Sequence, residues 1–198
     1  MTEDEIILLP ELYNGKTIRK GEQWMKSILF IDACVRKESR TRRLAEFLLS
    51  RLGVESERLC LSQLGLKGLD EYGTEHRDSA LAKQFAAADI IVAAAPYWDL
   101  SFPSILKTYI EHICVNGVTF RYSPEGVPIG LCSAKKLYYV TTSGGPIMDD
   151  AFGFGYIQAL AKGMFGIPEC VCIKAENLDI AGNDVEAILE RAEKEIKI

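Results

Sequence analysis

Three short segments of the sequence carry residues suited to binding a polar or planar molecule. The first is Cys34–Thr41, with the sequence CVRKESRT. Ser39 and Thr41 stand where a helix is expected to begin, so their hydroxyls and the first backbone amides of the helix could hold a phosphate. Basic residues crowd the same stretch: Arg36, Lys37, Arg40, Arg42 and Arg43. A helix cap beside a solvated basic face is the alternative interpretation.

The second and third segments each follow an apolar run. Pro96–Pro103 (PYWDLSFP) gathers Tyr97, Trp98 and Asp99, and such a loop can lay backbone amides and flat side chains along a planar ligand. Thr141–Pro146 (TTSGGP) contains paired glycines, which let a backbone approach a ligand closely. Aromatic packing under a helix and a tight turn are the alternatives. Each segment alone is weak evidence for a ligand site. Together they are stronger evidence, because all three are expected at one edge of a sheet.

Alternating strands and helices are the elements that bring the segments together. Continuous apolar runs at 28–31, 90–95 and 137–141 are typical of strands buried on both faces of a parallel sheet. The remaining elements are weaker strands at 57–61 and 170–174, helices near 44–52, 80–88, 104–114, 151–165 and 185–196, and a hairpin at 118–126. This order predicts an α/β fold, a doubly wound five-stranded parallel sheet with helices on both faces. Ligands bind such sheets at the carboxyl ends of the strands.

Length and composition narrow the class of protein. The 198 residues suit one globular domain, which we expect over 26–198 after an N-terminal extension at 1–25. The net charge of -5 argues against a nucleic-acid partner. No apolar run reaches the roughly 18 residues that a membrane helix needs. The start MTEDE lacks the basic residues of a signal peptide, so a cytoplasmic location without membrane association is expected.

Several common cofactor sites are disfavoured by missing motifs. The sequence has no G-x-x-x-x-G-K-[ST] phosphate loop, and no G-x-G-x-x-G follows the first strand. Six cysteines without a CxxC pair are expected to be reduced, mostly buried thiols. With two well-separated histidines, a metal site has little support.

Residues 94–111 (AAPYWDLSFPSILKTYIE) resemble the flavin loop and following helix of the FMN-dependent NAD(P)H azoreductases and quinone reductases. Residues 117–122 (GVTFRY) are similar to the next segment of that family. Residues 142–145 (TSGG) stand where the family has its second flavin loop, and 39–41 (SRT) resemble its phosphate site. The resemblance covers roughly residues 26–195 and is most specific over 94–145.

The resemblance implies a flavodoxin-like fold and a homodimer with FMN at the interface. It implies that Ser39, Arg40 and Thr41 hold the phosphate, with Cys34 where the family often has a serine. The flavin ring would be lined by residues of the second segment, Pro96, Tyr97, Trp98, Asp99 and Leu100. Residues of the third segment would contact its pyrimidine edge and ribityl chain: Thr142, Ser143, Gly144 and Gly145. Phe120 is expected to reach the substrate pocket of the partner.

The implied reaction is ping-pong hydride transfer from NADH or NADPH through FMN to a quinone, an azo compound or a similar flat acceptor. The flavin carries the chemistry, so no side chain is expected to act as acid or base. Two departures from the family pattern stand out. Asp99 replaces a common asparagine, and Pro146, Ile147 and Met148 occupy the stretch where many members carry a histidine.

The sequence bears on three alternatives, of which the receiver domain is nearly excluded. A flavodoxin-type electron carrier would have a T-x-T-G-x-T loop, which is missing here. A signalling receiver domain would need an acidic pair after the first strand, whereas Asp32 ends that strand alone. A non-catalytic FMN-binding protein is compatible with the same residues.

Overall fold

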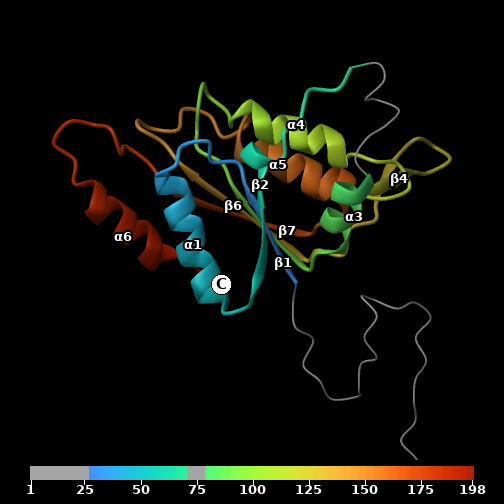
Figure 1. Cartoon of the computed structure of the whole chain (residues 1–198), viewed down its shortest axis with the longest axis horizontal. Coiled ribbons are helices and arrows are strands. Elements are labelled where there is room, and N and C mark those ends of the chain that lie inside the picture. The colour runs from blue at the N-terminus through green and yellow to red at the C-terminus, as the bar shows by residue number, and fades with distance from the viewer. Residues whose placement is uncertain (1–26, 71–78) are drawn as a thin grey trace, which may run out of the picture.

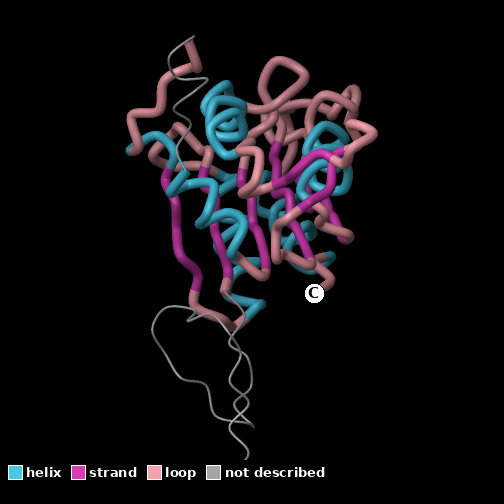
Figure 2. The backbone as a smooth tube through the Cα atoms, turned by 90° about the vertical axis from the view of Figure 1, so that its right-hand side faces the viewer, coloured by secondary structure: helices cyan, strands magenta, loops and turns pink. Residues whose placement is uncertain are grey.

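The computed structural model describes residues 27–70 and 79–198. The predicted extension at 1–25 lies outside these ranges. Figure 1 shows a sheet crossed by helices on two sides, and Figure 2 shows the strands running side by side toward one end where loops gather. Within the described ranges, no helix is long and apolar enough to cross a membrane.

The sheet is five-stranded and parallel, as predicted. Its order is β2-β1-β3-β6-β7, and every neighbouring pair is parallel. All residues of β1 and β3 are buried, which explains their unbroken apolar runs. The chain runs outward from β1 to β2 and returns to β3 on the other side, so the topological switch point lies between β1 and β3. The strands are β1 (Ile28–Asp32), β2 (Ser56–Cys60), β3 (Ile90–Ala94), β6 (Lys136–Thr142) and β7 (Glu169–Ala175).

Helices cover both faces of the sheet, so the predicted fold class is confirmed. Helices α1 (Arg40–Leu52) and α6 (Val185–Glu195) pack on one face, in a core cluster with Phe30, Val92 and Tyr138. The opposite face is covered by α3 (Ser79–Ala87), α4 (Ser104–Ile113) and α5 (Phe154–Leu160). Two cores separated by the sheet are the expected result of strands whose alternate side chains point to opposite faces.

Some helix and strand ends agree with the prediction from sequence, and others differ by a few residues. Ser39 caps α1, and Gly53 ends it at φ +66°, where a glycine avoids the strain of a left-handed backbone. The predicted helix at 151–165 begins later, at α5, and finishes in a π-helical turn, η2 (Ala161–Phe165). The predicted second strand ends one residue early because Leu61 begins a 3₁₀ turn, η1 (Leu61–Gln63).

The predicted hairpin is formed by β4 (Phe120–Tyr122) and β5 (Pro128–Gly130), paired antiparallel. Its base rests on the end of η2. A Cβ atom at Gly130 would lie 2.2 Å from the backbone nitrogen of Gly166, so the two backbones touch and leave no room for a side chain.

At the carboxyl edge of the sheet, backbone hydrogen bonds between neighbouring segments continue past the ends of the strands. The amide of Ala33 donates to the carbonyl of Ala94 at 2.9 Å, and Ala95 donates to Val140 at 2.9 Å. Tyr97 then donates to the carbonyl of Thr142 at 3.0 Å. The three loops predicted to carry the site therefore start from fixed backbone positions at one edge.

Candidate functional site

The first loop, residues 33–39 after β1, is held from inside by Arg42 on the first turn of α1. The Arg42 guanidinium donates to the carbonyl oxygens of Cys34 (2.8 Å), Arg36 (3.0 Å) and Lys37 (2.7 Å). Its Nε donates to the carboxylate of Asp32 at 2.8 Å. Arg42 thus makes four hydrogen bonds, three to the loop and one to the end of β1.

Asp32 is fully buried at the end of β1 and receives three donors. Besides Arg42, Arg58 on β2 donates at 2.6 Å, and the Cys34 amide donates at 3.0 Å. Burial pushes the pKa of Asp32 upward, but the hydrogen bonds from the two arginines and from Cys34 outweigh it and hold the pKa below its ordinary value. The carboxylate therefore stays ionised and anchors both arginines.

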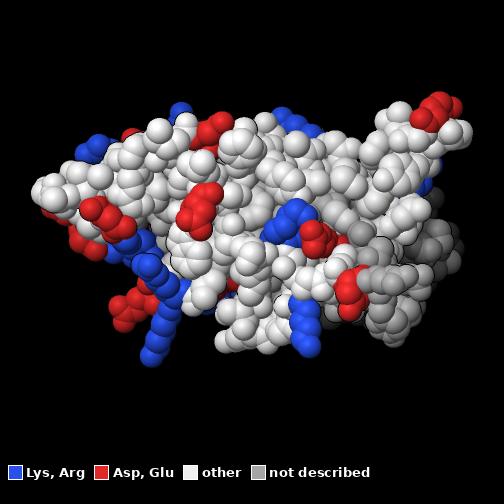
Figure 3. All heavy atoms as spheres, turned by 90° about the horizontal axis from the view of Figure 1, so that it is seen from above, with Lys and Arg blue, Asp and Glu red and all other residues white. Residues whose placement is uncertain are grey.

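The basic residues of the first segment do not form one open basic patch. Arg40 binds the carbonyl of Leu178 and the carboxylate of Asp179, and Arg43 pairs with Glu186. Arg36 lies over the ring of Trp98, 6.0 Å from its centroid, and so joins the first loop to the second. On the face shown in Figure 3, blue and red side chains are interspersed on a largely uncharged surface.

The hydroxyl and thiol groups of the first segment have separate places. Ser39 caps α1 by accepting from the Arg42 amide at 3.3 Å. Thr41 is 1% exposed, and its hydroxyl pairs with that of Thr142 at 2.6 Å, so this side chain ties α1 to β6. The Cys34 thiol is buried near the carbonyl of Ala94, and burial raises its pKa to about 12. Both side chains are thus buried against neighbouring strands, and their predicted place at a phosphate site stays a prediction.

Backbone amides of the first loop remain unused by the protein. Among the residues that the structure describes, none accepts a hydrogen bond from the amides of residues 35 to 41. Consecutive amides beside the start of a helix make a concave anion-binding surface. The sequence predicts a phosphate at this position, and that assignment stays a prediction.

The second loop, after β3, makes a tight turn. Trp98 and Ser101 exchange two backbone hydrogen bonds of 3.0 and 2.8 Å around Asp99 and Leu100. Both turn residues have positive φ, +50° and +67°, which costs energy for a non-glycine residue. Leu100 is half exposed, and Trp98 is 37% exposed. The hydroxyl of Tyr97 is buried with no partner among the described residues. Backbone strain and an unpartnered buried hydroxyl are features that cluster at functional sites.

The third loop, residues 143–145 after β6, is held from behind by residues 177–179. The amides of Leu178, Asp179 and Asn177 donate to the carbonyls of Ser143, Gly144 and Gly145 at 3.1, 2.9 and 3.2 Å. Within the described ranges, the amides of Gly144 and Gly145 have no acceptor. The third loop thus resembles the first, with carbonyls bound by the protein and the two glycine amides without an acceptor, although the Ser143 amide donates to the carbonyl of Ala175.

Gly144 lies against the side chain of Asp179, whatever its predicted contact with a ligand. A Cβ atom there would lie 2.3 Å from Oδ2 of Asp179, the carboxylate that binds Arg40 at 2.7 Å. Gly145 has no heavy atom within 4 Å of an added Cβ. Asp179 therefore links the third loop to the start of α1 and fills the space beside Gly144.

Phe120 lies in the hairpin rather than among the three loops. It is 6% exposed, and its ring packs edge-on against Tyr122, 5.3 Å between centroids. This enclosure within its own chain gives no support to the expected reach into a partner's pocket. Tyr122 is the more exposed aromatic of the hairpin, at 53%.

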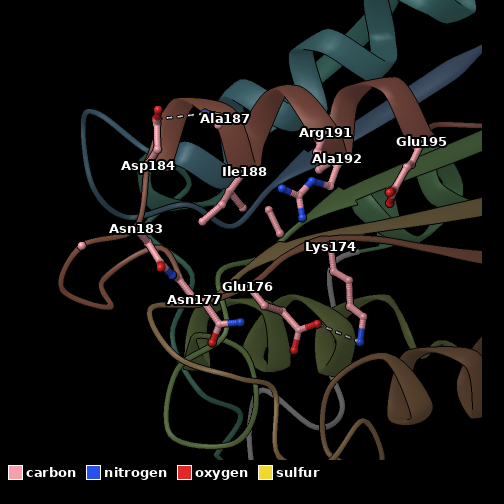
Figure 4. A pocket seen from close by; sticks show the side chains of 12 residues that line it. Lys174, Glu176, Asn177, Asn183, Asp184, Ala187, Ile188, Arg191, Ala192 and Glu195 are labelled. Carbon is pink, nitrogen blue, oxygen red and sulfur yellow. Dashed lines mark hydrogen bonds and ion pairs between the residues drawn. The ribbon is translucent and has the colours of Figure 1, made fainter.

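A groove of about 440 Å³ lies elsewhere, between β7 and α6. Figure 4 shows the guanidinium of Arg191 pointing into it from α6, opposite the ion pair of Lys174 and Glu176 at 3.2 Å. No residue of the three predicted loops lines the groove. Its relation to the site is indirect, because Glu176 also accepts a hydrogen bond from the Ile147 amide at 2.7 Å.

Sequence reasoning missed two residues that organise the site. Asp32 offered a signal, since a lone acid ending a buried apolar strand needs partners. Asp179 offered none, because its partner Arg40 is 139 residues away in the sequence.

Residues 26–197 match the family model described as a flavodoxin-like fold. The chain belongs to this family. The curated relatives it resembles include the FMN-dependent NADH:quinone oxidoreductase 2 of Clostridium acetobutylicum, 43% identical over 134 residues, which cover 63% of this chain and 66% of the relative. A second is the FMN-dependent NADH:quinone oxidoreductase of Caldicellulosiruptor bescii, 39% identical over 130 residues, covering 63% and 64%. The match spans slightly less than two thirds of each relative.

Solved structures agree on the fold. An azoreductase from Bacillus anthracis str. Sterne superposes with a TM-score of 0.72 at 23% identity, covering 86% of this chain and 96% of the other. An FMN-dependent NADH-azoreductase from Bacillus anthracis str. Ames Ancestor, in complex with FMN, gives a TM-score of 0.73 at 21% identity, covering 86% and 95%.

We predict that Thr41→Val lowers the free energy of unfolding by about 1–3 kcal/mol, because the Thr142 hydroxyl loses its buried partner. Urea denaturation monitored by circular dichroism measures the change. Thr41→Ser keeps the hydroxyl and is the matched control, expected to lose less stability. Equal stability of Thr41→Val and the parent protein would contradict the Thr41–Thr142 bond.

We also predict that Gly144→Ala destabilises the protein through Asp179, whereas Gly145→Ala stays within about 0.5 kcal/mol of the parent. Combining Gly144→Ala with Asp179→Ala should recover stability, with a coupling of about 0.5–3 kcal/mol in a double-mutant cycle. Thermal unfolding of the three variants gives the coupling. Strictly additive effects of the two substitutions would show that Asp179 is not the obstacle.

Proposed function

We propose that the chain is an FMN-dependent NADH:quinone oxidoreductase that also reduces azo compounds and similar flat acceptors. The observation that carries the proposal is the shared design of the first and third loops. In both, several carbonyls are bound by the protein, while the amides of residues 35–41 and of Gly144 and Gly145 have no acceptor among the described residues, at the edge of the sheet where ligands bind. The names of the curated relatives support the same activity.

The residues at this edge fit FMN by their chemistry. The amides of residues 35–41, which have no acceptor among the described residues, suit a phosphate, and the Ser39 oxygen caps α1 beside them. The half-exposed Trp98 offers an aromatic surface to a planar ring. The amides of Gly144 and Gly145 suit polar atoms of the pyrimidine edge or ribityl chain. Pro96 and Leu100 complete the apolar surroundings.

When bound, FMN would accept a hydride from NADH and then pass two electrons to a quinone. The chain itself binds and orients the participants. Backbone amides of the loops can stabilise negative charge without a titrating side chain. Asp99 is exposed and brings no amide side chain to the turn. A single site that serves two substrates in turn predicts ping-pong kinetics, and a soluble nucleotide donor fits a cytoplasmic location.

Anaerobic visible spectra of the FMN-reconstituted protein test this function. We expect a bound-flavin spectrum that NADH bleaches faster than NADPH does, and that recovers when a soluble benzoquinone is added. Free FMN with the same nucleotides is the control. Steady-state rates at several quinone concentrations should give parallel double-reciprocal lines. Bound flavin that neither nucleotide reduces would instead favour an electron carrier or a non-catalytic flavoprotein.

A homodimer is part of the proposal. Leu100, Met148 and Phe152 are exposed by 50%, 74% and 57%, and Trp98 by 37%. Ser101, in the same loop as Leu100, donates to the Phe152 carbonyl at 2.6 Å. Exposed apolar side chains rimming a ligand site are typical of a protein interface.

We predict a solution mass twice that of the 22.0 kDa chain, measured by light scattering after size exclusion. Phe152→Ser should shift the equilibrium toward monomer. Ile180→Ser, which alters an exposed apolar residue on another loop, is the matched control and should leave the mass unchanged. A monomeric parent protein at micromolar concentration would refute the dimer.

A further inference from the structure

We propose that Arg42 is a positioning residue that shapes the phosphate-binding backbone without touching the phosphate. This inference rests on the proposed FMN function. Its starting observation is that one guanidinium binds three carbonyl oxygens of a single loop, those of Cys34, Arg36 and Lys37.

Peptide geometry converts this observation into a direction for the amides. The carbonyl of one residue and the amide of the next belong to one planar trans peptide and point in opposite directions. Because the carbonyls of Cys34, Arg36 and Lys37 point at Arg42, the amides of Val35, Lys37 and Glu38 point away from it. These same amides have no acceptor among the described residues. Arg42 therefore selects the loop conformation in which the amides face outward.

The guanidinium is largely committed within the protein, which leaves it little capacity for a second role as a phosphate ligand. Four of its five N–H groups are directed to Asp32 and to the loop carbonyls, and its side chain is 15% exposed. Asp32 is fully buried, and its carboxylate binds Nε of the Arg42 guanidinium. Arg58 is the other arginine that binds this carboxylate. A lysine would keep the positive charge but has one nitrogen, which cannot span three carbonyls and a carboxylate.

The contrast with the neighbouring basic residues sharpens the assignment. Arg43 is one position along α1 and pairs with the exposed Glu186. Arg58 binds the same Asp32 carboxylate as Arg42 but makes no contact with a loop carbonyl. Arg43 is therefore a control for the positive charge on α1, and Arg58 is a control for the hydrogen bonds to Asp32. Neither residue binds the loop carbonyls that Arg42 binds.

Titrations with FMN and with riboflavin, which lacks the phosphate, test the proposal. Flavin fluorescence is followed while deflavinated protein is added. Arg42→Lys is expected to weaken FMN binding by tenfold or more and riboflavin binding by less than threefold. Arg43→Lys and Arg58→Lys are expected to change the FMN-to-riboflavin affinity ratio by less than threefold.

The outcomes separate this proposal from the function on which it rests. A parent protein that binds neither flavin refutes the function. A parent protein that binds FMN, with an unchanged affinity ratio in Arg42→Lys, overturns the positioning role, and so does an equal loss for both flavins.

A second measurement needs no variant and remains decisive if Arg42→Lys does not fold. In ¹⁵N-labelled parent protein, the amide signals of Val35, Lys37 and Glu38 should shift on addition of FMN and much less on addition of riboflavin. Equal shifts with both flavins, or unmoved signals at saturating FMN, would overturn the proposal.

Discussion

A peptide group cannot turn its amide outward without turning its carbonyl inward, and the site of this protein depends on that constraint. An inward carbonyl inside a protein needs a donor, or the loop conformation becomes unfavourable. The chain supplies the donors in two ways. The Arg42 side chain serves the first loop, and the backbone of residues 177–179 serves the third. The candidate binding surface is therefore held from the back by other parts of the protein.

The same logic makes the three loops one mechanical unit. Thr41 bonds to Thr142, the Tyr97 amide bonds to the Thr142 carbonyl, and Arg40 bonds to Asp179. Arg36 above Trp98 adds a contact between the first and second loops. Because these ties are formed within the protein, little ordering is left for a ligand to impose. Preorganisation of this kind raises affinity by lowering the entropy lost on binding.

The fold followed readily from the sequence, whereas the internal structure of the site did not. Buried runs such as Ile28–Ile31 and Ile90–Ala95 have a physical cause that hydropathy reflects directly, and the alternation of strands and helices predicts a doubly wound parallel sheet. The role of Arg42 could not be predicted in this way. A basic residue near the start of a helix gives the same sequence pattern whether it faces solvent or the interior of a loop. Thr41 illustrates the same limit: its position suggested a phosphate ligand, while its side chain turns toward β6. Contacts such as Arg40–Asp179 depend on distant chain segments meeting, which local patterns do not encode.

The hairpin of β4 and β5 has a different kind of constraint at each of its ends. Its base is pressed against the backbone of Gly166, so Gly130 accepts no side chain. Its turn at 123–126 is held by local bonds from the Gly126 amide to the Ser123 carbonyl and is largely exposed. Insertions are tolerated where backbone is exposed and bonded only locally. The turn is thus a place where the chain can lengthen or carry a grafted peptide, while the base cannot vary.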